Sequence, residues 1–289
     1  PALAAAVPQA ANVAEAPDAS ASLDDLQPFW GERQSGIVNP RPAAGIFAAF
    51  DVLAETPDEL ADLLRRLTAR LAFLTQGGPA AVSDPKLPPP DSGILGPVIR
   101  PDNLTATVSV GASLFDHRPW LAGLKPRVLT RMQEFSNDAL VAELCHGDLG
   151  LQFCANTQDT NIHALRDILK NLPDRLVLKW KQEGQVPLVP PRPDGRKDSA
   201  RNFLGFLDGS ANPDSGDSAL MDGIVWVKPG AGEPEWAAHG SYQVVRIIRN
   251  RVEFWDRTAL TTQELIIGRH KASGAPLGHV AETDLPDFT

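Results

Sequence analysis

Asp208 has the clearest potential for chemistry in this chain, because it stands where an apolar run ends in a polar turn. Residues 203–207 read Phe-Leu-Gly-Phe-Leu, and residues 209–213 read Gly-Ser-Ala-Asn-Pro. A carboxylate at the edge of an apolar wall has an adjustable proton affinity, since desolvation disfavours its charged form and nearby backbone N–H groups favour that form. Asp-Gly and Asn-Pro are also ordinary turn signals. Taken alone, the local pattern therefore favours a structural turn over a catalytic acid.

The other candidate groups indicate less. His146 lies at the edge of an expected strand and His163 beside the apolar face of an expected helix, positions at which a histidine is more often structural than a ligand. His239 precedes a Gly-Ser-Tyr sequence, and His270 follows Arg269 in a basic loop. The sequence contains no nucleophile elbow, no glycine-rich phosphate loop and no Cys/His spacing typical of zinc sites.

Composition sets the limits within which these residues act. The 289 residues and 31.0 kDa are enough for one large domain or two smaller ones, and 43% hydrophobic with 22% charged residues is a globular composition. A net charge of −9 disfavours nucleic acid and anionic lipid as partners. No apolar run approaches the ~20 residues that cross a bilayer. Cys145 and Cys154 could pair across a hairpin, but their apolar surroundings favour buried thiols.

The first half of the chain carries a regular series of elements. Strands are expected at 46–53, 104–110, 148–154 and 176–181, and helices at 56–77 and 156–172; a proline-rich loop fills 78–101. The first helix has a capping box from Thr56 to Glu59 with Pro57 between them, and Gly77 ends it. This order of elements is the split βαβ, or ferredoxin-like, arrangement of an antiparallel sheet with two helices on one face.

The second half does not repeat this order in full. Residues 224–228 and 242–255 are expected as strands and 261–268 as a helix, which would be only part of a second copy. We therefore expect four segments: a disordered Ala/Pro-rich segment (1–40), a first ferredoxin-like half (41–183), a linker (184–200) and the first part of a second half (201–289). We also expect that the functional polypeptide is longer than this chain. The Ala-rich opening resembles the mature side of an export cleavage site, with a plain tail as the alternative.

A resemblance to a known family gives these residues a more specific meaning. Gly205-Phe206-Leu207-Asp208-Gly209 matches the GxxDG motif of the dye-decolorising haem peroxidases. Further segments similar to landmarks of that family are 91–96 (Asp-Ser-Gly-Ile-Leu-Gly), 145–148 (Cys-His-Gly-Asp), 212–213, 239–247, 253–255 and 267–269. The likeness covers about residues 40–289 and points to the exported bacterial branch that includes the deferrochelatase-like proteins of iron uptake.

The resemblance implies a fold, a cofactor and roles for named residues. The implied fold is α+β, a dimeric α+β barrel of two ferredoxin-like halves, the second incomplete in this chain. It would hold haem b in the second half. Asp208 would be the distal acid that takes a proton from hydrogen peroxide and returns it to the leaving oxygen. Gly209, Ser210 and Ala211 would approach the porphyrin through their backbone, and Arg246 would contact a propionate or lie on a solvated face.

The iron ligand is the main departure from the family pattern. None of the six histidines matches the motif of the family's proximal histidine, so the iron-ligating histidine is expected beyond Thr289. The implied function is peroxide reduction with oxidation of bulky aromatic or porphyrin-type donors. The alternatives are a deferrochelatase-like component of iron acquisition, and a fragment that cannot hold haem without the segment after Thr289. A periplasmic or extracellular location, a homo-oligomer and partners in iron uptake are further expectations.

Overall fold

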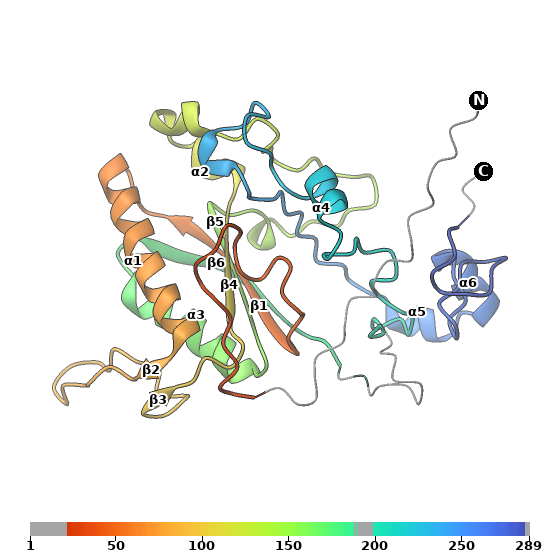
Figure 1. Cartoon of the computed structure of the whole chain (residues 1–289), viewed down its shortest axis with the longest axis horizontal. Coiled ribbons are helices and arrows are strands. Elements are labelled where there is room, and N and C mark those ends of the chain that lie inside the picture. The colour runs from red at the N-terminus through yellow and green to blue at the C-terminus, as the bar shows by residue number, and fades with distance from the viewer. Residues whose placement is uncertain (1–21, 188, 190–198, 287–289) are drawn as a thin grey trace. The chain divides into compact units, whose positions relative to one another are not determined.

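The computed structural model describes residues 22–187, 189 and 199–286. The chain divides into two compact units, which Figure 1 shows with their elements labelled. Of the described residues, we call 22–186 and 225–243 the sheet unit, and 187, 189, 199–224 and 244–286 the motif unit, because the second contains Asp208.

A four-stranded antiparallel sheet forms the centre of the sheet unit. Its strands are β1 (Ala44–Val52), β4 (Thr105–Val110), β5 (Leu149–Ala155) and β6 (Leu176–Gln185). They lie in the order β4-β5-β1-β6, with Phe50 opposite Leu149 and Ala106 opposite Phe153. β6, the last strand of the ferredoxin-like unit, thus pairs with the free edge of β1, and β5 lies between β1 and β4. The predicted split βαβ order of this half is confirmed.

Two helices, α1 (Pro57–Gln76) and α3 (Gln158–Asn171), cover one face of this sheet (Figure 1). The capping box of α1 is formed as predicted: the N–H of Glu59 donates to Thr56 Oγ1, and the Glu59 carboxylate accepts from the N–H of Thr56. Gly77 ends the helix at φ +75°, and a Cβ there would lie 2.6 Å from the carbonyl oxygen of Ile99. The sequence signals therefore set both ends of α1.

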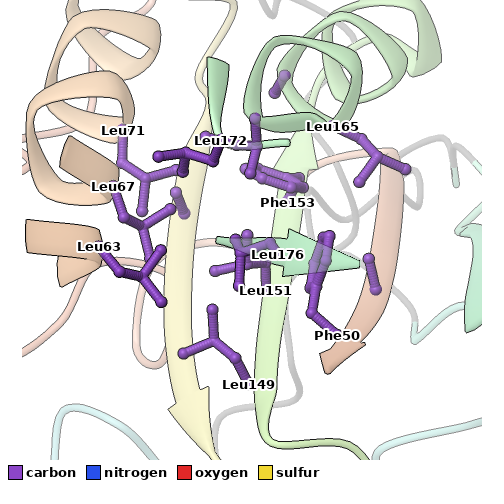
Figure 2. Packing of buried hydrophobic residues seen from close by; sticks show 14 of the residues in the cluster. Phe50, Leu63, Leu67, Leu71, Leu149, Leu151, Phe153, Leu165, Leu172 and Leu176 are labelled. Atoms are coloured by element: carbon purple, nitrogen blue, oxygen red, sulfur yellow. The ribbon is translucent and has the colours of Figure 1, made fainter. Parts of the chain in front are cut away.

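The core lies between these helices and the sheet. Leucines at helical spacing on α1 meet alternate residues of the strands, and Figure 2 shows Leu63, Leu67 and Leu71 facing the strand residues. Phe50 and Phe153 are fully buried at the centre. Each such side chain contributes about 1.5–3 kcal/mol by leaving water, so this packing fixes the sheet unit.

Shorter elements complete the sheet unit. They are the ribbon of β2 (Gly78–Pro79) and β3 (Val98–Ile99), which closes the predicted proline-rich loop, the helix α2 (Ala112–Asp116), and the 3-10 turns η1 (Pro119–Leu124), η2 (Ala142–Leu144) and η3 (Glu235–Ala237). Cys145 and Cys154 are both free thiols, as the sequence favoured, but each is half-buried and not buried as predicted.

Part of the predicted disordered segment 1–40 lies outside the described residues. The described part makes fixed contacts with the sheet: the carbonyl oxygen of Ser35 accepts from Thr107 Oγ1 at 2.7 Å, and Gln34 bonds both backbone groups of Val108. Most of the predicted linker 184–200 also lies outside the described residues.

The second half of the chain, residues 201–289, differs from the sequence prediction. Its helices are α4 (Ser218–Ile224), α5 (Val252–Asp256) and α6 (Leu260–Ile267), so the predicted helix at 261–268 is confirmed. The predicted strands at 224–228 and 242–255 are wrong. α4 ends at Ile224, Trp226 forms only an isolated bridge to Ser241, and α5 occupies the end of the second range.

The alternating apolar pattern of residues 242–250 explains why a strand was wrongly predicted at 242–255. A strand is stable only with a paired neighbour, and in the described part of the motif unit backbone pairing is limited to the isolated bridges Arg201↔Leu207 and Arg269↔Pro276. Val244 and Ile248 are accordingly 68% and 66% exposed. The pattern thus describes a half-buried surface that this unit does not build.

Candidate functional site

The loop that carries Asp208 is held by backbone and side-chain hydrogen bonds from its own approach. The N–H of Asp208 donates to the carbonyl oxygen of Ala200 at 2.9 Å, and Leu207 pairs with Arg201 in an isolated bridge. The Asn202 side-chain oxygen accepts from the N–H groups of Leu204 and Phe206 at 3.0 and 3.2 Å. The apolar run therefore forms a closed turn that delivers Asp208 at its end.

Phe206 anchors this turn in the interior of the motif unit. Its ring is 2% exposed, and its centroid lies 5.9 Å from that of Trp255 in an edge-on arrangement. The Trp255 indole N–H donates to the carbonyl oxygen of Leu204 at 3.1 Å, and the Lys271 ammonium lies 5.5 Å from the Phe206 ring centroid. One buried aromatic residue thus fixes the direction of the Asp208 loop.

Asp208 itself is exposed, and the residues after it are small. Gly209 adopts φ +103°, a conformation that a residue with a Cβ rarely takes, and the N–H of Asn212 closes the turn on the carbonyl oxygen of Gly209 at 3.0 Å. Ser210 is half-buried and Ala211 is exposed. The loop therefore presents a carboxylate beside a backbone surface that a flat ligand can approach.

A second segment of the motif unit, residues 269–282, supports this loop. Arg201 donates to the carbonyl oxygens of Lys271 at 2.6 Å and Ala272 at 3.1 Å. Ser210 Oγ donates to Glu282 Oε1 at 2.7 Å. Sequence reasoning singled out Arg269 of this segment but not Glu282, because no local motif marks a residue that is distant in sequence from its partner.

The remaining predicted site residue, Arg246, lies in the same unit, in the exposed segment 242–250. Its role toward a propionate stays a prediction. For the described residues, no group of three or more His, Cys, Asp or Glu side chains is placed to hold a metal ion. The expectation of an iron-ligating histidine outside these residues also stays a prediction.

Two of the histidines, His163 and His146, have structural surroundings. His163 is 1% exposed, and its Nδ1 is 2.7 Å from Ser92 Oγ, so it anchors the 91–96 loop to α3. Burial lowers the pKa of His163, although Asp91 and Asp167 oppose this shift. Burial likewise lowers the pKa of His146, whose Nε2 accepts from Arg131 Nε at 3.2 Å.

Two hollows in the sheet unit are alternative sites. One, of about 180 Å³, is lined by Arg70, Asp167, Asp91 and six other residues. The second, a more open groove of about 480 Å³, lies over residues 52–55 and 117–120. Asp148, the last residue of the predicted 145–148 landmark, has a structural role, since it accepts hydrogen bonds from Arg118 at 3.1 Å and from Ser113 at 2.6 Å. Neither hollow is lined by a predicted site residue.

Across the residues that the structure describes, every helix is too short or too polar to cross a membrane.

Comparisons with known proteins place the chain in a family. A family described as "Dyp-type peroxidase, N-terminal" matches residues 34–185, and one described as "Dyp-type peroxidase, C-terminal" matches residues 199–285. Proteins named Deferrochelatase are similar over most of the chain: that of Yersinia pestis is 54% identical over 94% of this chain, and that of Escherichia coli strain K12 is 55% identical over 92%. The chain spans 63% of the length of either relative.

Solved structures agree with this result and confirm the fold class. A DyP-type peroxidase from Streptomyces coelicolor matches with a TM-score of 0.80 and 31% identity, covering 93% of this chain and 70% of that one. An oxyferrous/water mixed complex of DtpA from Streptomyces lividans matches with a TM-score of 0.79 and 32% identity, over 93% of this chain and 70% of that one. With both family matches in order along its length, the chain belongs to the DyP-type peroxidase family.

Proposed function

We propose that the chain provides the acid-bearing part of a haem b-dependent peroxidase that reduces hydrogen peroxide and oxidises bulky aromatic or porphyrin-type donors. The observation that carries this proposal is the Asp208 loop: an exposed carboxylate, braced from both sides, in a chain of the DyP-type peroxidase family. The similar DtpA structure is an oxyferrous complex, which supports an iron cofactor.

The residues around Asp208 fit one face of a haem. A flat macrocycle needs close access to the protein backbone, and Gly209 with its positive φ, followed by Ser210 and Ala211, leaves that access open. A carboxylate at the edge of this backbone surface can exchange a proton directly with a ligand that is bound beside it. We assign this face of the haem to residues 208–211 and assign no iron ligand within the described residues.

Bound haem would supply the iron that binds hydrogen peroxide and takes up its oxidising equivalents. Asp208 would do the proton chemistry: a carboxylate oxygen accepts a proton from the near oxygen of the peroxide and delivers it to the far oxygen, which leaves as water. Two donor molecules would each give up one electron for every peroxide consumed. The hydrogen bond from the Asp208 N–H to the carbonyl oxygen of Ala200 fixes the main chain from which this carboxylate projects.

The test uses the complete natural polypeptide loaded with haem. We expect a Soret absorption band and peroxide-dependent bleaching of a bulky anthraquinone dye. A protein that retains its haem band yet leaves the dye and the peroxide unchanged would contradict the peroxidase proposal.

A second candidate function is the release of iron from haem, and the name Deferrochelatase of the relatives at 54–55% identity favours it. It predicts that haem incubated with the protein yields fluorescent iron-free porphyrin with an intact ring. If only ring-opened products or unchanged haem are recovered, this candidate fails while the peroxidase proposal stands.

Location and partners belong to the same proposal. We propose export to the periplasm or the medium, in line with the exported branch that the sequence resembles, and association as a homo-oligomer with components of iron uptake. Cell fractionation with an antibody against the chain tests the location. Recovery in the cytoplasmic fraction alone would contradict it.

A further inference from the structure

The segment that supports the Asp208 loop contains one carboxylate directed at that loop. Glu282 Oε1 accepts a hydrogen bond of 2.7 Å from Ser210 Oγ, two residues after Asp208. The main chain of Glu282 is fixed as well, because its carbonyl oxygen accepts from Arg269 NH1 at 3.0 Å. The same Arg269 nitrogen donates to the carbonyl oxygen of Gly274 at 2.6 Å. Arg269 therefore holds the main chain at both Gly274 and Glu282.

Gly274 makes the second contact with the loop, on the other side of Asp208. It adopts φ +75°, and a Cβ placed on it would lie 2.5 Å from Leu207 Cδ1 and 3.2 Å from Glu282 Cγ. Leu207 and Glu282 thus pack against the same glycine, at distances that leave no space for a methyl group. Asp208 stands between a residue packed on Gly274 and a residue bonded to Glu282.

These contacts leave few ways for the Asp208 loop to move. Leu207, the residue before Asp208, is held by packing. Ser210, two residues after Asp208, is held by a hydrogen bond to a charged group, which is stronger than a hydrogen bond to a neutral group. A group that moves a proton must be held within hydrogen-bond reach of the oxygen that gives the proton up. The Asp208 side chain is exposed, so no surrounding side chains fix it by packing. Its position therefore depends on the contacts that Gly274 and Glu282 make with its neighbours Leu207 and Ser210.

We propose that Glu282 is a positioning residue for the Asp208 loop, acting through Ser210 and held in turn by Arg269. This inference rests on the proposed function, in which Asp208 moves the peroxide proton. Glu282 does not itself touch substrate or haem in this assignment. Its effect is on how long Asp208 stays in its working position.

The first test measures the loop directly by hydrogen exchange on the complete natural polypeptide, with and without haem. Two amides report the loop, because the N–H of Asp208 is bonded to Ala200 and that of Asn212 to Gly209. Glu282→Ala is expected to speed their exchange about tenfold, as for the loss of one hydrogen bond to a charged group. Glu282→Gln retains the acceptor oxygen and should restore slow exchange.

Three more variants complete this test. Ser210→Ala removes the same bond from the other side, so the double variant Ser210→Ala/Glu282→Ala should exchange no faster than either single variant. The matched control is Glu253→Ala, an exposed carboxylate of the same unit that pairs with Arg257 on the surface of α5. Unchanged exchange in both Glu282→Ala and Ser210→Ala would overturn the inference.

The second test measures the reaction with hydrogen peroxide in the same haem-loaded proteins. Glu282→Ala should lower the rate about tenfold in parallel with the loosened loop, with Glu282→Gln close to wild type and KM for the aromatic donor unchanged. A lower rate without faster exchange would show a direct role and overturn the positioning role. Asp208→Asn separates the two proposals: an unchanged peroxide rate in that variant contradicts the proposed function, whereas the exchange result still decides whether Glu282 braces the loop.

Discussion

The ion pair between Arg70 of α1 and Asp167 of α3 gives the sharpest prediction about the sheet unit. Arg70 Nε and NH2 donate to the two carboxylate oxygens of Asp167 at 2.8 and 2.5 Å, and the Asp167 side chain is only 1% exposed. Replacing Arg70 by Leu would leave this carboxylate buried without its cation. Breaking a buried pair from one side costs about 3–5 kcal/mol, which is a large part of the stability of a domain.

The chain contains a matched control for this prediction. Arg66, one turn earlier on α1, makes the same bidentate contact with Asp174, at 2.9 and 3.0 Å. In this pair the side chains of Arg66 and Asp174 are 35% and 51% exposed. Water screens this pair, so Asp174→Ala should change the unfolding free energy far less. The double variant Arg70→Leu/Asp167→Leu should recover most of the loss, because apolar residues replace both charges.

Urea unfolding followed by far-UV circular dichroism is the assay, since α1 and α3 are the longest helices among the described elements. The reasoning predicts the order Arg70→Leu least stable, then the double variant, then Asp174→Ala near wild type. A loss below about 1 kcal/mol in Arg70→Leu would show that Asp167 finds water despite its burial, and would refute the argument.

Three further predictions concern other residues. Thr56→Ala should lower the unfolding free energy by about 1 kcal/mol through loss of the α1 cap, read from the same urea curves; no change would contradict the capping role. Burial lowers the pKa of His163 from its usual 6.5, so as pH falls through that value the unfolded state takes up protons before the folded state does. The unfolding free energy should therefore be highest above that pH and decrease as pH falls below it. His163→Gln should flatten this dependence between pH 7 and 5, and a slope that persists would assign it to another group. Gly274→Ala should speed proteolysis of the motif unit, because its Cβ meets Leu207 and its φ is +75°; wild-type resistance would show that Leu207 moves aside at no cost.

The sequence was sufficient for the four-stranded sheet and its two covering helices, α1 and α3, because local signals and tertiary burial agree there. The α1 leucines repeat at helical spacing and end at a glycine, and the strand residues that alternate, such as Ala106 and Phe153, face the same core. The motif unit shows the opposite case. Residues 242–250 have the alternation of a strand, yet Val244 and Ile248 are exposed in the structure. Strand formation depends on a neighbouring strand, which a local pattern cannot reveal.

The candidate site divides in a similar way. Asp208 could be found from sequence because the turn after it and the family motif are both local. Glu282 could not, since its contact with Ser210 joins residues that are 72 positions apart and depends on how Arg269 and Gly274 fold the intervening segment. A group that acts by supporting another residue carries no spacing of its own.

The central claim is that Asp208 moves the proton of hydrogen peroxide, and one rate tests it most directly. The rate of reaction with hydrogen peroxide should be measured for the haem-loaded natural polypeptide and for Asp208→Asn, with Asp222→Asn as the control from an exposed carboxylate of α4. Asp208→Asn should be slower by about 10²–10⁴-fold, the range of general acid–base catalysis, while its haem absorption band and the control remain as in wild type. An Asp208→Asn protein with its haem in place and a rate equal to wild type would contradict the account.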